Sequence, residues 1–330
     1  MSTPFRPRTL APLCLALVAS CGGTEPIVAT PPTPPAASAV ASAAPAAAPK
    51  PPPVAAPAAA PVEDMPDVVF GPKTASDAPK KAPRLLVLSP MQDALLATAQ
   101  ARTTDVRVSL TGWETQKGGS HVHLILDNHP YKALFDLKDP VKLGDLLAPG
   151  EELSEGEHVL IAFPSRMNHE SVKAEGALCV QRFWVGKRGK SAWKSHESPL
   201  LVFSRPKGAY NGDKADEVLV DWYLANVELG DKFQIRATLK GPGLDEVGRV
   251  ISIKEWRPYM LANLRNGDYT ISMELLEKSG QVVPSPFPAE FNATTRTIHI
   301  DHAASDAPPA AAPSPASSAS PAPSPHAGHE

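Results

Sequence analysis

The sequence predicts an all-β protein, with two tandem immunoglobulin-like β-sandwich domains flanked by disordered tails rich in proline and alanine. Three observations predict this architecture. Of the 38 prolines, only 12 lie within residues 84–302, so the other 26 are concentrated at the two ends. Between the ends, short apolar or alternating segments recur with turn residues between them. The same middle region also contains an internal repeat.

Residues 1–20 are predicted to be a lipoprotein signal peptide. Arg6 and Arg8 precede an apolar stretch of about ten residues, half the ~20 that a transmembrane helix needs. The stretch ends in Val-Ala-Ser-Cys at 18–21, which resembles the bacterial lipobox. That resemblance implies that Cys21 is acylated, with palmitate or a similar chain, and becomes the mature N-terminus. The glycine after Cys21 resembles outer-membrane sorting. An ordinary secretory signal is the alternative.

The segments that flank the middle region are expected to be spacers. Residues 21–83 and 303–330 are dominated by Ala, Pro, Val and Ser. Such compositions bury too little apolar surface to offset the entropy of ordering, and proline favours an extended chain. We therefore expect 21–83 to be a disordered tether and 303–330 a disordered tail.

The middle region is expected to form one sandwich over 84–205 and a second over 206–302. Its segments are short and apolar or alternate with period two, as strands do. The expected strands cover residues 84–88, 106–110, 121–126, 158–163 and 177–185 in the first sandwich, and 218–222, 233–239, 250–253, 269–275 and 297–300 in the second.

The internal repeat is read from three matches. Residues 122–131 align without gaps on 250–259, and both end in Pro-Tyr. Residues 156–161 match 267–272, since each has a glycine and an acid before an alternating strand. Upstream, 106–110 pairs with 233–239 at nearly equal distance. A period of 110–130 residues indicates tandem domains rather than a solenoid.

Histidines of the first repeat are the candidate metal ligands. On a strand, His121 and His123 point to the same face, about 7 Å apart. His169 lies in a loop after a later strand, with Met167 or Glu170 available as a fourth ligand. Neutral imidazoles suit copper and zinc. The sequence thus offers His121, His123 and His169 as a copper or zinc site.

The repeat also offers a structural alternative for these histidines. In the gap-free alignment His121 matches Arg249 and His123 matches Ile251, so the second copy has no histidine there. Ile251 and Ile253 suggest that this face points inward. Under this interpretation His123 is a hydrogen-bonded histidine at the edge of the core.

Other function classes are disfavoured by charge and motifs. The net charge is −3, whereas nucleic-acid binding needs a concentrated basic face. The sequence has no nucleophile elbow, phosphate loop or His-Glu-x-x-His motif, so we expect no enzyme. The basic stretch 187–194, which contains one tryptophan, is a candidate for binding an anionic glycan.

Three strings resemble a family of uncharacterised bacterial envelope proteins of cyanobacteria and other Gram-negative groups. They are HVHLILDNHPY at 121–131, FPSRMNHE at 163–170 and PLLVFSRPKG at 199–208. The resemblance implies an exported, often lipid-anchored protein of the outer membrane or periplasm, and it carries no assigned activity. We therefore expect a non-catalytic binding or scaffolding role toward an envelope protein or glycan, with metal binding as the alternative.

Overall fold

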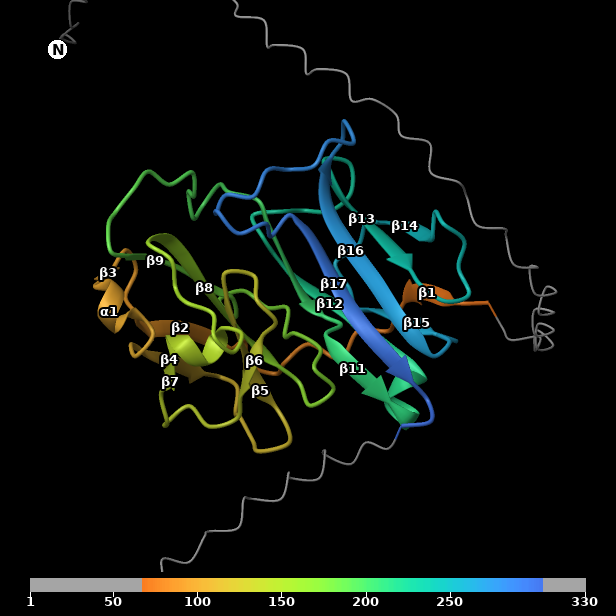
Figure 1. Cartoon of the computed structure of the whole chain (residues 1–330), viewed down its shortest axis with the longest axis horizontal. Coiled ribbons are helices and arrows are strands. Elements are labelled where there is room, and N and C mark those ends of the chain that lie inside the picture. The colour runs from red at the N-terminus through yellow and green to blue at the C-terminus, as the bar shows by residue number, and fades with distance from the viewer. Residues whose placement is uncertain (1–66, 305–330) are drawn as a thin grey trace, which may run out of the picture. The chain divides into compact units, whose positions relative to one another are not determined.

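The computed structural model describes residues 67–304, which belong to one compact unit (Figure 1). The predicted signal peptide, Cys21, most of the 21–83 segment and nearly all of 303–330 lie outside these residues. The all-β prediction is confirmed, because helix is limited to α1 (Thr98–Ala101) and two short 3-10 turns, η1 (Leu143–Leu146) and η2 (Gly212–Ala215), within the described part. The strands are β1 (Val69–Pro72), β2 (Arg84–Ser89), β3 (Leu95–Leu96), β4 (Asp105–Thr111), β5 (His121–Leu126), β6 (Lys132–Leu134), β7 (Val141–Lys142), β8 (Gly156–Ser165), β9 (Cys179–Val185), β10 (Leu200–Arg205), β11 (Gly208–Asn211), β12 (Glu217–Ala225), β13 (Phe233–Lys240), β14 (Arg249–Ile253), β15 (Tyr259–Ala262), β16 (Gly267–Glu277) and β17 (Ala293–Asp301).

The first sandwich pairs a sheet of order β2-β4-β7 with a sheet of order β3-β9-β8-β5-β6. In β4, Val106 and Val108 are buried between exposed or half-buried neighbours, the alternation of a strand with one face on a core. β3 runs parallel to β9, while the other pairs are antiparallel. An edge strand that joins the opposite sheet in this way is typical of immunoglobulin-like sandwiches.

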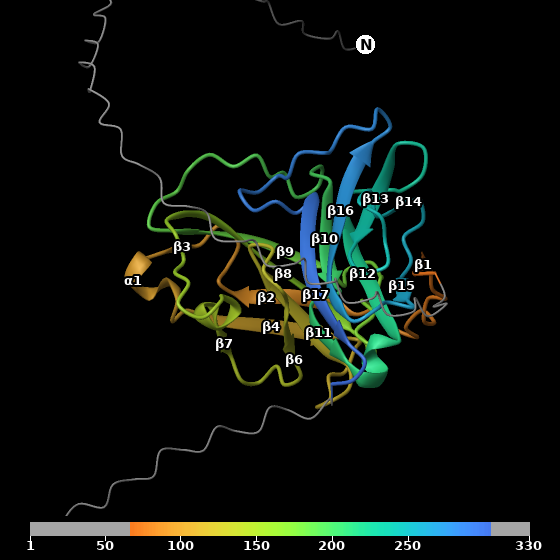
Figure 2. The ribbon, with the colours of Figure 1, turned by 45° about the vertical axis from the view of Figure 1, so that its right-hand side comes forward.

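The second sandwich repeats this topology. Its sheets have the orders β10-β12-β15, extended at the edge by β1, and β11-β17-β16-β13-β14. β11 runs parallel to β17, as β3 does to β9. Figure 2 shows β16 lying beside β13 and β14 in the second of these sheets. Trp222 is fully buried in the core of this sandwich.

Two segments lie on the other side of the expected boundaries. β10 was placed in the first sandwich by the boundary after residue 205, but it hydrogen-bonds to β12 of the second. β1 lies within the expected tether, yet it pairs with β15, and the apolar side chains of Val68 and Phe70 enter the second core. In Figure 1 the orange β1 accordingly lies beside the cyan β15. Local composition could not reveal these assignments, because the partner strands are far away in sequence.

The gap-free repeat alignment is wrong for the histidine strand. Strand order makes β13 the counterpart of β5, whereas the aligned segment 250–253 belongs to β14, the counterpart of β6. The 106–110 match has the same fault, since β4 corresponds to β12. The match of 156–161 with 267–272 does join equivalent strands, β8 and β16. Pro-Tyr precedes the edge strand β6 in one copy and follows the edge strand β14 in the other, so similar short strings occupy different positions.

A shared apolar cluster joins the two sandwiches. It combines Ile161 and Phe163 of β8 with Val202 of β10, Tyr223 of β12 and Phe291 near β17, all buried. The outer face of β8 is therefore covered by the second sandwich rather than by solvent. Burial of this face determines the surroundings of the histidines.

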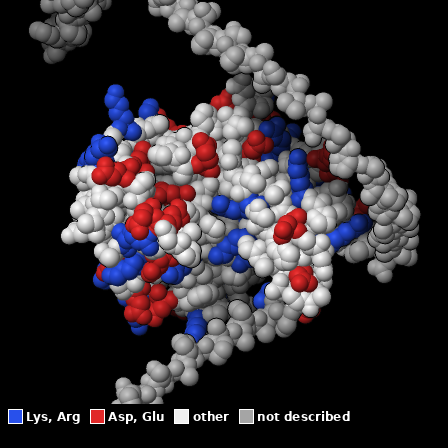
Figure 3. Space-filling view, in the orientation of Figure 1, with Lys and Arg blue, Asp and Glu red and all other residues white. Residues whose placement is uncertain are grey.

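The surface carries charges of both signs. On the face drawn in Figure 3, lysine and arginine side chains are interspersed with aspartate and glutamate. None of the helices in residues 67–304 has the length and apolarity required to cross a membrane.

Candidate functional site

Strand β5 is buried on both faces, but the two faces contact different parts of the protein. Val122, Leu124 and Leu126 enter the core of the first sandwich. His121 and His123 point to the opposite face and are 0% exposed. The inward orientation inferred from the repeat is therefore wrong, because the histidines lie on the outer face of their sheet. They are buried there because other parts of the chain cover that face.

The equivalent face of the second sandwich is polar and accessible. In the first sandwich, Phe163 of β8 lies opposite His123 of β5. Strands β8 and β16 both begin at a glycine, and when these glycines are aligned, Glu274 of β16 is the counterpart of Phe163. Arg236 opposes Glu274 and bonds to it at 2.7 Å on the surface. His123 therefore occupies the position of an exposed arginine in the second copy.

A tight turn after β8 brings His169 to the two strand histidines. The His169 N–H donates to the Arg166 carbonyl at 2.9 Å, and the Arg166 N–H donates to the Glu170 carbonyl at the same distance. His169 has a φ of 67°, in the left-handed region that few non-glycine residues adopt. His121 opposes Ser165, the last residue of β8, so the turn begins beside the end of β5.

Three ring nitrogens converge at this point. The Nε2 atoms of His121 and His123 are 3.0 Å apart, and Nδ1 of His169 is 3.1 Å from Nε2 of His121. One ligand atom from each histidine lies within 4.8 Å of the others. Within residues 67–304, this is the one such group of three or more His, Cys, Asp or Glu side chains. The structure thus brings together all three predicted ligands.

A backbone carbonyl determines the tautomer of His121. Its Nδ1 lies 2.8 Å from the Gly119 oxygen, which can only accept, so Nδ1 carries the proton. Nε2 of the neutral ring therefore presents its lone pair to the centre of the group. A hydrogen bond of this kind from the second ring nitrogen is the usual support of a metal-binding histidine.

Burial keeps the three imidazoles neutral. Desolvation lowers the pKa of His121 and places that of His123 well below its usual value. Desolvation, followed by the charge of Arg205, lowers the pKa of His169 to about 3. Protons therefore compete weakly for these nitrogens at neutral pH, as a metal ligand requires.

The donor set fits a transition metal. Two nitrogens bound to one zinc ion at ~2.1 Å in a tetrahedral arrangement lie about 3.4 Å apart. Two of the nitrogen pairs here are 3.0 and 3.1 Å apart and all three lie within 4.8 Å, so the rings would move to admit an ion. Three histidines and an open fourth position suit zinc or copper. No fourth His, Cys, Asp or Glu side chain joins this group in the described residues.

The expected fourth ligands point elsewhere. Met167 is 70% exposed. The Glu170 carboxylate accepts hydrogen bonds from the Ser76 N–H at 3.0 Å and from the Ser76 hydroxyl at 2.6 Å. The turn presents only His169 to the strand, because its neighbours in the chain project away from that side.

Three further residues border the histidines, and none of them was expected from the sequence to be a site residue. The Tyr131 ring stacks on His123, with centroids 3.5 Å apart, and its hydroxyl lies 3.3 Å from His169 Nδ1. Arg205 and Lys207 lie over the other parts of the Tyr131 ring, at 5.5 and 3.9 Å from its centroid. All three residues occur in the family-like strings at 121–131 and 199–208, and that was the only indication of them in the sequence.

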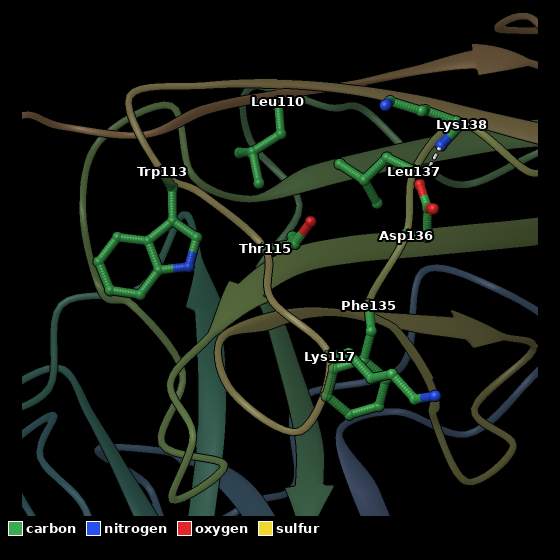
Figure 4. Close-up of a pocket in the computed structure, with 8 residues that line it drawn as sticks. All are labelled: Leu110, Trp113, Thr115, Lys117, Phe135, Asp136, Leu137 and Lys138. Carbon is green, nitrogen blue, oxygen red and sulfur yellow. Dashed lines mark hydrogen bonds between the residues drawn. The ribbon is translucent and has the colours of Figure 1, made fainter.

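Two cavities adjoin the group. One, of about 690 Å³, is lined by Trp113 and Phe135 on different sides (Figure 4), and the Phe135 ring lies 4.8 Å from that of His121. The other, of about 490 Å³, has His169, Arg205 and Lys207 in its wall. Of the three histidines, only His169 lines one of these cavities.

The comparisons with known proteins identify no family. No family model matches the chain, and no curated protein matches it either, so the resemblance of the three strings stays a prediction. Among solved structures, the fibronectin(III)-like modules of Clostridium thermocellum CbhA are 13% identical over 66% of this chain and 95% of theirs, with a TM-score of 0.22. The FN1–FN3 domains of chicken CNTN1 are 13% identical over 67% of each chain, with a TM-score of 0.21. Likenesses this weak support no inference about ligand or activity.

Proposed function

We propose that the protein is a non-catalytic binding protein whose first sandwich binds a copper or zinc ion through His121, His123 and His169. The observation that carries the proposal is the convergence of three neutral imidazole nitrogens from two distant segments within 4.8 Å. Of the two alternatives open from sequence, this favours the ligand site over the edge-of-core histidine. The same nitrogens hydrogen-bond to one another at 3.0 and 3.1 Å, and a bound ion would replace those hydrogen bonds.

The sequence adds a location to this proposal. The lipobox-like string ending at Cys21 supports a lipid anchor, and the glycine that follows supports the outer membrane as its destination. The protein would then hold its metal site at the cell envelope, tethered by the Pro/Ala-rich segment. An envelope protein or glycan is the partner class proposed for the remaining surface.

Titration of the purified full chain with zinc, and separately with copper, tests the metal site. We expect saturable one-to-one binding at micromolar concentration or tighter, weakened at least 100-fold by His121→Ala or His123→Ala. His299→Ala is the matched control, because His299 is half exposed and pairs with Asp268 outside the group. Binding that is absent, or equal in all variants, would overturn the metal site. Binding of an envelope protein or glycan would then be the function to test.

A further inference from the structure

Two cations next to the histidines lack acidic partners. Arg205 ends β10, and its Nη1 donates to the Tyr210 hydroxyl at 3.0 Å. Lys207 donates from Nζ to the Tyr131 carbonyl at 2.6 Å. Neither forms an ion pair with a carboxylate among residues 67–304, and Nε of Arg205 is buried without a hydrogen-bond partner.

The cavity of about 490 Å³ gives these cations a shared opening. His169 and Arg205 line it together with Lys207, so both cations that lack acidic partners face it. Among the described residues that line it, the one carboxylate is that of Glu217, which pairs with Lys73 at 3.3 Å. The cavity therefore has the charge of an anion site and the size of a small-molecule site.

Placing a metal cation at the histidines creates an electrostatic conflict. Three neutral imidazoles bring no negative charge, while Arg205 and Lys207 stand beside the group and are partly buried. Burial weakens solvent screening, so repulsion between these cations and a metal ion is strong. An anion between them would remove the conflict, and the open fourth metal position needs a ligand.

We propose that the metal is bound together with a small oxyanion, a carboxylate or a phosphate, which occupies the cavity beside His169. One oxygen of the anion takes the fourth position on the metal, and the others accept hydrogen bonds from Arg205 and Lys207. Arg205 suits this role because a guanidinium donates two parallel hydrogen bonds to carboxylate or phosphate oxygens. This inference rests on the proposed metal site and names its co-ligand.

Thermodynamic linkage between metal binding and anion binding provides the test of the shared site. If metal and anion share the site, each raises the affinity for the other by the same factor. Zinc affinity of the full chain would be measured at controlled free zinc in chloride buffer, then with added acetate or with added inorganic phosphate. We expect at least one of the two anions at millimolar concentration to raise zinc affinity about tenfold, and the better one identifies the class.

Variants separate an anion effect from a general salt effect. Lys207→Gln should abolish the enhancement and, because it removes a repelling charge, should leave zinc binding in chloride equal or tighter. Arg205→Gln should behave likewise. Lys187→Gln is the control, since Lys187 is exposed and lies 3.9 Å from Glu155, outside the cavity. It should retain the enhancement.

The outcomes distinguish the two proposals. Zinc binding through the histidines that is indifferent to both anions in the wild type would overturn the co-ligand and leave the metal site intact. An enhancement that survives in both Lys207→Gln and Arg205→Gln would also overturn it. Absence of zinc binding would overturn both proposals.

Discussion

At the scale of single residues, the pKa values of the buried histidines are shifted in opposite directions, downward in the group of three and upward in His158. Within residues 67–304 no carboxylate pairs with His121, His123 or His169, and burial lowers their pKa. His158 is also buried, and burial opposes its charge, but Asp127 at 2.5 Å and the Ser154 carbonyl at 2.8 Å raise its pKa above the usual value. A neutral ring suits a metal ligand, while a charged ring suits an ion pair.

The His158–Asp127 pair predicts a pH-dependent contribution to stability. A raised pKa in the folded state means that the contribution is full below the unfolded pKa of about 6.5 and is lost as pH rises through the folded value. We expect the wild type to lose more stability than His158→Gln between pH 5.5 and pH 8.5. Urea unfolding midpoints at both pH values would measure the difference. Equal losses in the two proteins would contradict the role assigned to this pair.

At the scale of elements, the turn after β8 is held from outside the first sandwich. Glu170 accepts from the backbone and the hydroxyl of Ser76, which lies in the segment between β1 and β2. The turn also bridges Ser165 to Ser171, and this bridge places His169 above the end of β5. The position of the third ligand therefore depends on a carboxylate that does not touch the other histidines.

We expect Glu170→Ala to weaken zinc binding by about 10- to 100-fold, the usual effect of losing a residue that positions a ligand. The reason is that the turn loses its attachment to Ser76. Glu170→Gln, which keeps an acceptor for Ser76, should restore most of the affinity. Glu175→Ala, at an exposed position nearby, is the control. A loss in Glu170→Gln as large as in Glu170→Ala would indicate that the charge itself matters, as it would for a direct ligand.

At the scale of the whole described region, the two sandwiches share more than a linker. A buried apolar cluster spans them, and Lys173 of the first bonds to the fully buried Asp221 of the second at 2.5 Å. The Ser171 N–H donates to the other oxygen of the same carboxylate at 2.9 Å. Contacts of this kind resist independent motion of the two sandwiches.

We expect the sandwiches to unfold together in one calorimetric transition, with equal calorimetric and van 't Hoff enthalpies. Lys173→Met should destabilise the fold by about 3–5 kcal/mol, because it leaves a buried carboxylate unpaired. Lys73→Met is the matched control, since its pair with Glu217 is exposed and should contribute about 0–1 kcal/mol. Two separate transitions in the wild type would contradict the shared core.

Local patterning determined much of this protein by itself. Period-two alternation located β4, β13, β16 and β17, because a strand between core and solvent shows its two faces in its own residues. The three ligand candidates could also be named from residue type and spacing. These properties are local, so the sequence reports them directly.

Only the tertiary structure decided which strands are equivalent, which face the histidines occupy and what surrounds them. β1 and β10 joined the second sandwich through partners far along the chain. His121 and His123 are buried on an outer sheet face because the rings of Tyr131, Phe135 and His169 lie against them. Arg205 and Lys207 reach Tyr131 from more than 70 residues away. Pairing and coverage are long-range, and no short window of sequence contains both partners.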